Sequence, residues 1–244
     1  MNASTSPILR NARCLLDALL EFETLSHQEL AEIMEIPRST VYRLVEGMEA
    51  VDLVRALPGG RTALSGRWLR LSDAARAAQT EWRDARAAMR EVSGRTGCTS
   101  YLSVLVGRQS VCLDWAQGRA AEALMLKPGR TLPLYAGAAG RGTLAALPAD
   151  ELQGYLAEAP FPVLTPHTMT TGAQLVEDVA RTRAQGYTVS LQDVTLGLGA
   201  VGVEVKDPSG QKAAILSLGA FADDIGHRLD ELVDELRRAV ADLR

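Results

Sequence analysis

The chain has 244 residues, and its 26 Lys and Arg against 30 Asp and Glu give a formal net charge of −4. Hydrophobic residues make up 47% and charged residues 23%, a balance that excludes a disordered chain. No apolar run approaches the ~18–20 residues that cross a bilayer, and the start lacks the apolar stretch of a signal peptide. We therefore expect a cytoplasmic protein with no membrane partner. The cysteines, Cys14, Cys98 and Cys112, are an odd number at wide spacings, which predicts neither a disulfide framework nor a metal site.

A DNA-binding face in this chain would have to come from local segregation of charge. Residues 1–70 contain eight Arg and nine acidic residues, a net charge of −1, so the N-terminal part is not basic as a whole. The stretch between Glu35 and Glu46 has no acid, yet it carries Arg38 and Arg43. This acid-free stretch is where a nucleic-acid contact is expected.

Three helices are predicted in the first 50 residues. Apolar residues at three-and-four spacing predict a helix over 8–20. Ser26 and Glu29 have the spacing of a capping box, which starts a second, short helix that ends before Pro37. A third helix is predicted from about 38 to 48, and its inward face would consist of Val41, Leu44, Val45 and Met48.

This arrangement is typical of a helix-turn-helix, whose last helix enters the major groove of double-stranded DNA. The outward residues at its start can donate to phosphates or base edges: Arg38, Ser39, Thr40, Tyr42 and Arg43. Residues 53–64 predict a β-hairpin with a turn at 58–60, a wing that places Arg55 and Arg61 beside the groove. The alternative is a helical hairpin of a bundle whose arginines are simply solvated.

The rest of the chain predicts an α+β domain. Residues 67–94 are helical in pattern, as a linker helix followed by a second helix. Strands are predicted at 101–106, 110–115, 187–191, 200–206 and 212–218, with a further short one at 124–126. Helices are predicted from about 138 to 147, at 149–158, at 172–185, and in a closing amphipathic segment that runs from Ile225 to Leu243.

Motifs for catalysis are weak. Residues 197–202, GLGAVG, satisfy GxGxxG, so a nucleotide-dependent enzyme is the alternative function; yet a strand pattern follows where dinucleotide binding requires a helix. His27, His167 and His227 show no spacing that indicates a catalytic triad. We expect no enzyme activity, no cofactor and no metal.

A small-molecule site is predicted at the helix that opens near Ala138 and Ala139. Helix-start amides lack intrahelical partners, and the small side chains of residues 136–142 allow close approach, so an anionic or carbonyl oxygen can bind there. Arg141 is the only cation expected nearby. The alternative is a tightly packed loop with no ligand.

In its ordered motifs the sequence resembles the IclR family of bacterial transcriptional regulators. The resemblance rests on residues 26–71, then GRTLPLYAGAAGRGTLAALP, RTRAQGYTVS and VKDPSGQKAAILSLGAF. It implies a winged helix-turn-helix at 1–67, a linker helix at 68–78 and a GAF-like effector-binding domain at 79–244. It also implies a homodimer or homotetramer, a repressor or activator, that binds a small organic effector. The residues that would surround the effector are Leu132, Ala138, Ala139, Gln192, Ala200, Ser217 and Gly219.

Several positions depart from the family pattern. Tyr135 stands where the family usually has His, Gln192 and Asp193 replace an acidic pair, and Ala200 replaces a frequent Cys. Ser217 keeps one hydroxyl where some members have two. With fewer polar anchors, we expect a less polar effector or a wider pocket. The effector is predicted to be a carboxylate or an aromatic compound.

Overall fold

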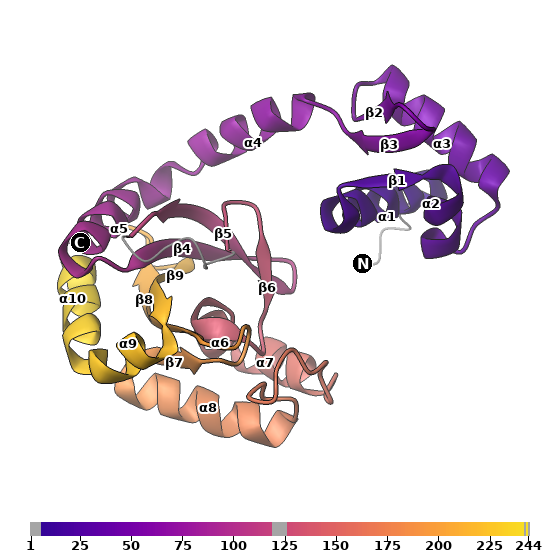
Figure 1. Ribbon diagram of the computed structural model, residues 1–244. Helices are drawn as coiled ribbons and strands as arrows, with labels where there is room; N and C mark the ends of the chain where they lie inside the picture. The colour runs from indigo at the N-terminus through magenta and orange to yellow at the C-terminus, as the bar shows by residue number, and fades with distance from the viewer. Residues whose placement is uncertain (1–5, 119–125, 242, 244) are drawn as a thin grey trace. The chain divides into compact units, whose positions relative to one another are not determined.

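The computed structural model describes residues 6–118, 126–241 and 243. The chain divides into two compact units, residues 1–78 and 79–244 (Figure 1). This fold, a helical winged unit followed by an α+β unit, is the class that the sequence predicts.

The N-terminal unit packs three helices against a small antiparallel sheet. Buried side chains from all three helices, among them Leu15, Leu30 and Val45, form one core. The strands lie in the order β1-β3-β2, and the exposed helix α4 follows them. The elements are α1 (Pro7–Phe22), β1 (Thr24–Ser26), α2 (His27–Met34), α3 (Arg38–Ala50), β2 (Val54–Leu57), β3 (Arg61–Leu64) and α4 (Arg67–Ala78).

The capping box that starts α2 forms as predicted. The amide of Glu29 donates to Ser26 Oγ at 3.2 Å, and the amide of Ser26 donates to Glu29 Oε2 at 2.7 Å. The predicted hairpin is also present, as β2 and β3. Strand β1 was not predicted, because three residues are too few to show an alternating pattern; Leu25 is buried in it, and Ser26 pairs with Arg61 of β3.

The C-terminal unit is built on a six-stranded antiparallel sheet in the order β6-β5-β4-β9-β8-β7. Its strands are β4 (Thr99–Val106), β5 (Gln109–Ala116), β6 (Thr131–Pro133), β7 (Thr188–Leu191), β8 (Leu198–Lys206) and β9 (Ala213–Phe221). Its helices are the short η1 (Thr80–Trp82), α5 (Arg83–Thr96), α6 (Gly137–Ala146), α7 (Ala149–Leu156), α8 (Gly172–Gln185), α9 (Ala222–His227) and α10 (Leu229–Ala241).

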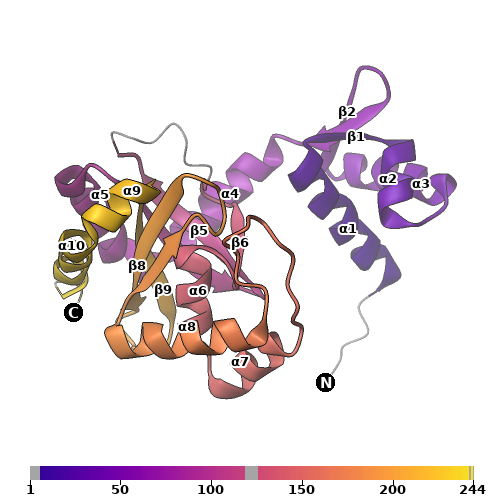
Figure 2. The ribbon, with the colours of Figure 1, turned by 60° about the horizontal axis from the view of Figure 1, so that its bottom comes forward.

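Helices cover both faces of this sheet. Helices α5 and α10 pack on one face, and α6, backed by α8, packs on the other (Figures 1 and 2). Each face has its own apolar core: one includes Met89, Leu216 and Leu236, and the other includes Leu144 and Leu175. The second face is the one that carries the candidate ligand site.

The closing segment of this unit differs from its prediction. The closing helix, predicted as one segment, is interrupted at Arg228 and forms the two helices α9 and α10. The apolar periodicity continues across Arg228, so the sequence pattern did not reveal the break. The strand predicted at 124–126 falls largely on residues outside the described part of the chain.

Helix α6 approaches the backbone of the preceding segment very closely. A Cβ atom at Gly140 would lie 2.2 Å from the carbonyl oxygen of Pro133, a distance that no side chain can occupy. Gly94 in α5 is a helical glycine with nothing within 4 Å of the equivalent position. The backbone contact therefore requires a glycine at position 140, whereas position 94 has room for a side chain.

We expect Gly140→Ala to destabilise the protein by about 1–3 kcal/mol, because α6 must shift to relieve the overlap. The matched variant Gly94→Ala should be neutral or stabilising by up to ~1 kcal/mol, because alanine is the better helix former and meets no neighbour. Chemical unfolding of both variants measures the difference. Equal effects of the two substitutions would contradict the close approach of α6.

Candidate functional sites

The first site is the outer face of α3. Val41, Val45 and Met48 point into the core, each at most 5% exposed, which fixes the rotation of the helix. This rotation brings five predicted residues together on the exposed surface of its first two turns: Arg38, Ser39, Thr40, Tyr42 and Arg43. A left-handed residue, Glu35, ends α2, and Pro37 precedes α3, so the chain reverses sharply between the two helices.

Two of these side chains are held in place by neighbours. The Arg38 guanidinium donates to the Tyr42 hydroxyl at 3.3 Å, and its Cζ lies 5.5 Å from the centre of the Tyr42 ring. The His27 ring, at the start of α2, lies 4.1 Å from the Tyr42 ring, centre to centre. Burial lowers the pKa of His27, and the positive charge of Arg38 lowers it further. The imidazole is therefore neutral at pH 7, and the cluster's positive charge lies on Arg38.

Arg61, the sixth residue predicted to contact DNA, contacts β1 and α2. Its guanidinium donates to Thr24 Oγ1 at 3.0 Å and to the Thr24 carbonyl at 2.6 Å, and it pairs with Glu29 at 3.2 Å. These contacts tie the hairpin to β1 and to the first turn of α2. Arg61 therefore has a structural role that the sequence did not reveal, because its partner Thr24 belongs to the unpredicted strand.

The second site is a cavity of about 400 Å³ between the sheet and the N-terminus of α6. Six of the seven residues predicted to surround an effector line it: Leu132, Ala138, Ala139, Ala200, Ser217 and Gly219. The seventh, Gln192, is not among the lining residues. Its backbone is left-handed (φ 61°) and its Oε1 accepts the amide of Gly197 at 2.9 Å, so it shapes the turn that precedes β8.

Polar residues that sequence reasoning missed complete the lining. They are Ser190 of β7, Thr131 of β6 and Thr195 in the turn before β8. Lys127 and Arg130 add two basic side chains. Tyr101 of β4 contributes a phenol that is 4% exposed. Burial raises the pKa of Tyr101, so its hydroxyl stays protonated and can donate a hydrogen bond. An alternating strand pattern marks one face of β4, but it cannot show that a cavity lies there.

The expectation that Arg141 is the only cation near the predicted site is wrong, because Lys127 and Arg130 line the cavity and Arg141 does not. Arg141 is 2% exposed, and its guanidinium pairs with Asp178 of α8 at 2.6 Å and with Asp193 at 3.1 Å. It also donates to the carbonyl of Val189. Two buried carboxylates more than offset its charge, and Asp178 also pairs with Arg181 at 2.9 Å. The basic side chains that line the cavity are those of Lys127 and Arg130.

Asp193 connects this ion pair to the cavity wall. Its Oδ2 accepts the amide of Gly137, the first residue of α6, at 3.1 Å, and its Oδ1 accepts the hydroxyl of Ser190. One of the helix-start amides is thus already occupied by a carboxylate of the protein. The next two amides, of Ala138 and Ala139, belong to residues that line the cavity, and they have no intrahelical acceptor in a regular helix.

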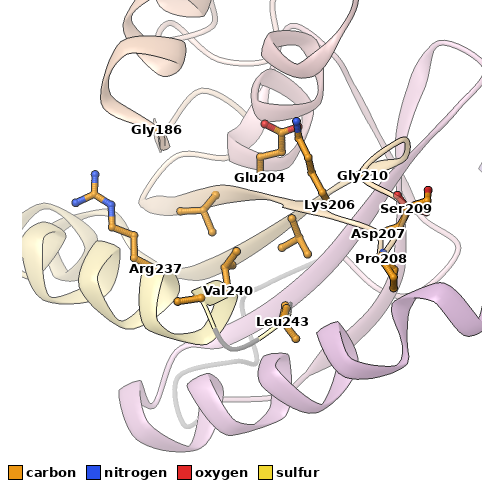
Figure 3. A pocket seen from close by; sticks show the side chains of 13 residues that line it. Gly186, Glu204, Lys206, Asp207, Pro208, Ser209, Gly210, Arg237, Val240 and Leu243 are labelled. Atoms are coloured by element: carbon orange, nitrogen blue, oxygen red, sulfur yellow. Dashed lines mark hydrogen bonds between the residues drawn. The ribbon is translucent and has the colours of Figure 1, made fainter.

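A second cavity, of about 790 Å³, lies where the hairpin after β8 meets α10 (Figure 3). Three of its polar side chains are already engaged: Asp207 accepts from Ser209 Oγ and from two backbone amides, and Arg237 donates to the carbonyl of Gln185. Glu204 and Lys206 point away from Val240 in Figure 3. This cavity therefore offers a mostly apolar wall and no convergent set of hydrogen-bonding groups.

The GxGxxG segment does not have the context of a dinucleotide site. Gly197 forms a turn at φ 79°, and residues 198–206 continue as strand β8, so no helix N-terminus follows the glycines. Among the described residues, no three His, Cys, Asp or Glu side chains gather as metal ligands would. None of the helices described is long and apolar enough to span a membrane.

Residues 82–244 match the family described as "Bacterial transcriptional regulator IclR C-terminal". The chain belongs to the IclR family. Its N-terminal residues 12–65 match a second family of regulators, "Sugar-specific transcriptional regulator TrmB". The protein is a helix-turn-helix transcriptional regulator, as the sequence predicts.

Relatives and solved structures in the IclR family agree with this assignment over most of the chain. The HTH-type transcriptional regulator XynR of Escherichia coli is 26% identical over 198 residues, which cover 81% of this chain and 79% of XynR. An IclR regulator from Alicyclobacillus acidocaldarius has the same fold, with a TM-score of 0.83 at 23% identity over 98% of both chains. An IclR homologue from Microbacterium hydrocarbonoxydans, crystallised with 4-hydroxybenzoate, gives a TM-score of 0.79 at 21% identity over 97% of each chain.

The environment of His27 in this IclR regulator can be tested by its titration. We expect its imidazole to titrate below the usual value of 6.5, and the variant Arg38→Ala to move the midpoint upward, because one of the two causes of the shift is removed. Because the pKa of His27 is lower in the folded state than in the unfolded state, the unfolded state takes up the proton first as the pH falls. The contribution of His27 to the free energy of unfolding is therefore fully present above pH 6.5 and is lost as the pH falls through the lowered pKa. NMR titration of the imidazole protons measures both midpoints; a midpoint that Arg38→Ala leaves unchanged would contradict the contact.

Proposed function

We propose that the protein binds operator DNA as a homodimer or homotetramer through α3, and that a small organic effector in the α6 cavity changes its operator affinity. In this proposal residues 1–67 bind DNA, residues 68–78 form a linker, and residues 79–244 bind the effector and contribute to assembly. The observation that carries the proposal is the exposed polar face at the start of α3. Its core residues face inward, so this face is free to enter a major groove.

The chemistry of that face supports a contact with DNA. Arg43 is exposed beside Tyr42, and a guanidinium can bind guanine through two hydrogen bonds. Ser39, Thr40 and the Arg38–Tyr42 pair suit phosphate contacts, which set register and carry no sequence information. Two copies related by a two-fold axis would read inverted half-sites, so the operator should be roughly palindromic.

The size and the lining of the α6 cavity support an effector site. About 400 Å³ suits a small organic molecule, and apolar walls with a few polar groups are typical of ligand sites. The amides of Ala138 and Ala139, which have no intrahelical acceptor in a regular helix, favour an anion such as a carboxylate, as do the basic side chains of Lys127 and Arg130. Effector binding would shift the population between arrangements of the protein with different operator affinities.

We infer that the protein acts by binding and has no enzyme activity of its own. The alternative, a nucleotide-dependent enzyme, depends on residues 197–202, which form a turn and a strand. Nucleotides that raised the melting temperature of the protein would support this alternative. Retention of operator fragments selected from genomic DNA supports regulation.

Arg43→Ala should weaken specific operator binding by about 1–3 kcal/mol if the guanidinium reads a base, and by less if it contacts only a phosphate. Arg90→Ala, which removes one exposed Arg from α5 of the other unit, is the control for net charge. Fluorescence anisotropy at several salt concentrations separates the two cases, because a lost phosphate contact reduces the salt dependence. Equal affinities for Arg43→Ala, Arg90→Ala and the wild type would remove Arg43 from the interface.

Ala138→Trp should abolish the response to effector while sparing operator binding. Ala138 is 1% exposed and lines the cavity, so an indole there would fill space that a ligand needs. Ala87→Trp, on the exposed side of α5, is the control for the added ring. Calorimetry with a panel of small organic acids, starting with benzoate and 4-hydroxybenzoate, measures binding, and a stable Ala138→Trp protein that binds them as the wild type does would show that the site is elsewhere.

A further inference from the structure

The histidine at the start of α2 is joined by side-chain contacts to the outer face of α3. The His27 ring lies 4.1 Å from the Tyr42 ring, centre to centre, and the Arg38 guanidinium donates to the hydroxyl of the same tyrosine at 3.3 Å. His27 is half-buried, whereas Arg38 and Tyr42 are exposed. The imidazole therefore borders the surface that the proposed function assigns to DNA.

The surroundings of the His27 imidazole disfavour its protonation in the free protein. Burial lowers its pKa most, and the two charges that shift the pKa further both lie on α3: Arg38 lowers it and Glu49 raises it. On α2 itself, Glu29 is engaged with a backbone amide and with Arg61 of β3. Strand β1, which leads into α2, contains no charged residue. The net effect is a lowered pKa, so another anion is needed to hold a proton on the imidazole at pH 7.

We propose that His27 contacts a DNA phosphate and takes up a proton when the operator binds, so that operator affinity rises as the pH falls. This inference rests on the proposed contact between α3 and the operator. In a helix-turn-helix the helix before the recognition helix crosses the DNA backbone. His27 is the first residue of α2 and is in contact with the exposed Tyr42 of α3, so it is the part of α2 closest to the proposed DNA-binding face.

Two effects of the DNA act on the imidazole in the same direction. A phosphate within ~4–6 Å of His27 favours its charged form, because opposite charges attract. A phosphate that pairs with Arg38 also offsets the guanidinium charge that disfavours protonation in the free protein. Both effects raise the pKa of His27 in the complex above its pKa in the free protein.

The linkage between proton binding and DNA binding fixes the sign of the pH dependence. A group with a higher pKa in the complex takes up a proton on binding. Operator affinity therefore increases as the pH falls through the pKa of the complex, and it levels off below the pKa of the free protein. His27 is the only histidine in residues 1–78, since His167 and His227 belong to the other unit. Histidine is the side chain whose ordinary pKa lies between pH 5 and 8, so His27 is the candidate for this linkage in the DNA-binding unit.

A purely structural role of the His27 ring is the rival explanation. Contact between two aromatic rings can hold Tyr42 in place without any charge on the imidazole. Loss of the ring would then weaken operator binding equally at every pH and leave the pH dependence unchanged. The two roles therefore differ in the pH dependence and the salt dependence of binding, rather than in the affinity at one pH.

The test measures the affinity of the full-length protein by fluorescence anisotropy, with a labelled duplex that the protein selects from random-sequence DNA. Between about pH 8 and about pH 5.5, the affinity of the wild type should rise more than that of His27→Gln, by about tenfold for each copy of His27 that contacts a phosphate, as a pKa difference of about one supplies. A protonated contact with one phosphate also makes the logarithmic salt dependence steeper by about one. The salt dependence of the wild type should therefore be steeper at the lower pH, whereas His27→Gln should show no such steepening.

His27→Lys and His227→Gln are the matched variants. Lysine keeps its positive charge throughout this pH range, so His27→Lys should retain the tighter binding up to about pH 8. His227 is exposed on α9 of the other unit, so His227→Gln removes a histidine without altering the DNA-binding unit and should keep the pH dependence of the wild type. Calorimetry of the wild type in two buffers that differ in ionisation enthalpy counts the protons taken up on binding, and this measurement needs no variant.

Each outcome bears on a different claim. Equal pH dependence in the wild type and His27→Gln, or no proton uptake by calorimetry, overturns the role of His27 while leaving the DNA contact of α3 intact. A loss of affinity in His27→Gln that is the same at every pH supports the structural role and also overturns the proposal. If both Arg38→Ala and Arg43→Ala bind the duplex as the wild type does at every pH, the contact of α3 itself is wrong, and the role of His27 falls with it.

Discussion

The shape of the cavity beside α6 depends on one buried network of ion pairs, in which the Arg141 guanidinium of α6 contacts two carboxylates. The carboxylate of Asp178 lies on α8, and that of Asp193 lies in the turn that precedes β8, so the two ion pairs connect both elements to α6. The same Asp193 accepts the first amide of α6 and the Ser190 hydroxyl of β7, so four elements meet around one guanidinium. The cavity lies directly beside this network, since Ser190, Val194 and the start of α6 line it.

Such a network contributes little net free energy to the stability of a fold. Charges lose their hydration when they are buried, and a well-packed apolar cluster is often as stable as a buried ion pair. Removal of one partner, however, leaves an uncompensated charge, which makes the arrangement of α6, α8 and the turn difficult to change. The fold places this rigid junction beside small residues such as Gly137 and Ala138, where rigidity defines the shape of the cavity.

The sequence was sufficient for features that depend on near neighbours in the chain. The Ser26 capping box, the inward face of α3 and the hairpin turn at 58–60 are all set within a few residues. Contacts between distant residues were not accessible in this way. Arg141 and Asp178 are 37 residues apart in sequence, and Arg61 pairs with a strand too short to predict. Tyr101 lines a cavity because of the face of β4 on which it lies, and periodicity alone does not show which face borders a cavity.

These distant contacts also bear on how the proposed effector would act within the C-terminal unit. A ligand changes a population only through contacts that differ between two arrangements. Most of the cavity wall is sheet backbone in regular register, which has little freedom to rearrange. The turn that carries Val194 and Thr195 is different, because it is held at one end by Asp193 and at the other by the amide of Gly197 on Gln192. A ligand that contacts this turn acts on the edge strand β7 and on α6 together, so this turn is the element of the cavity best placed to distinguish the bound state from the free state.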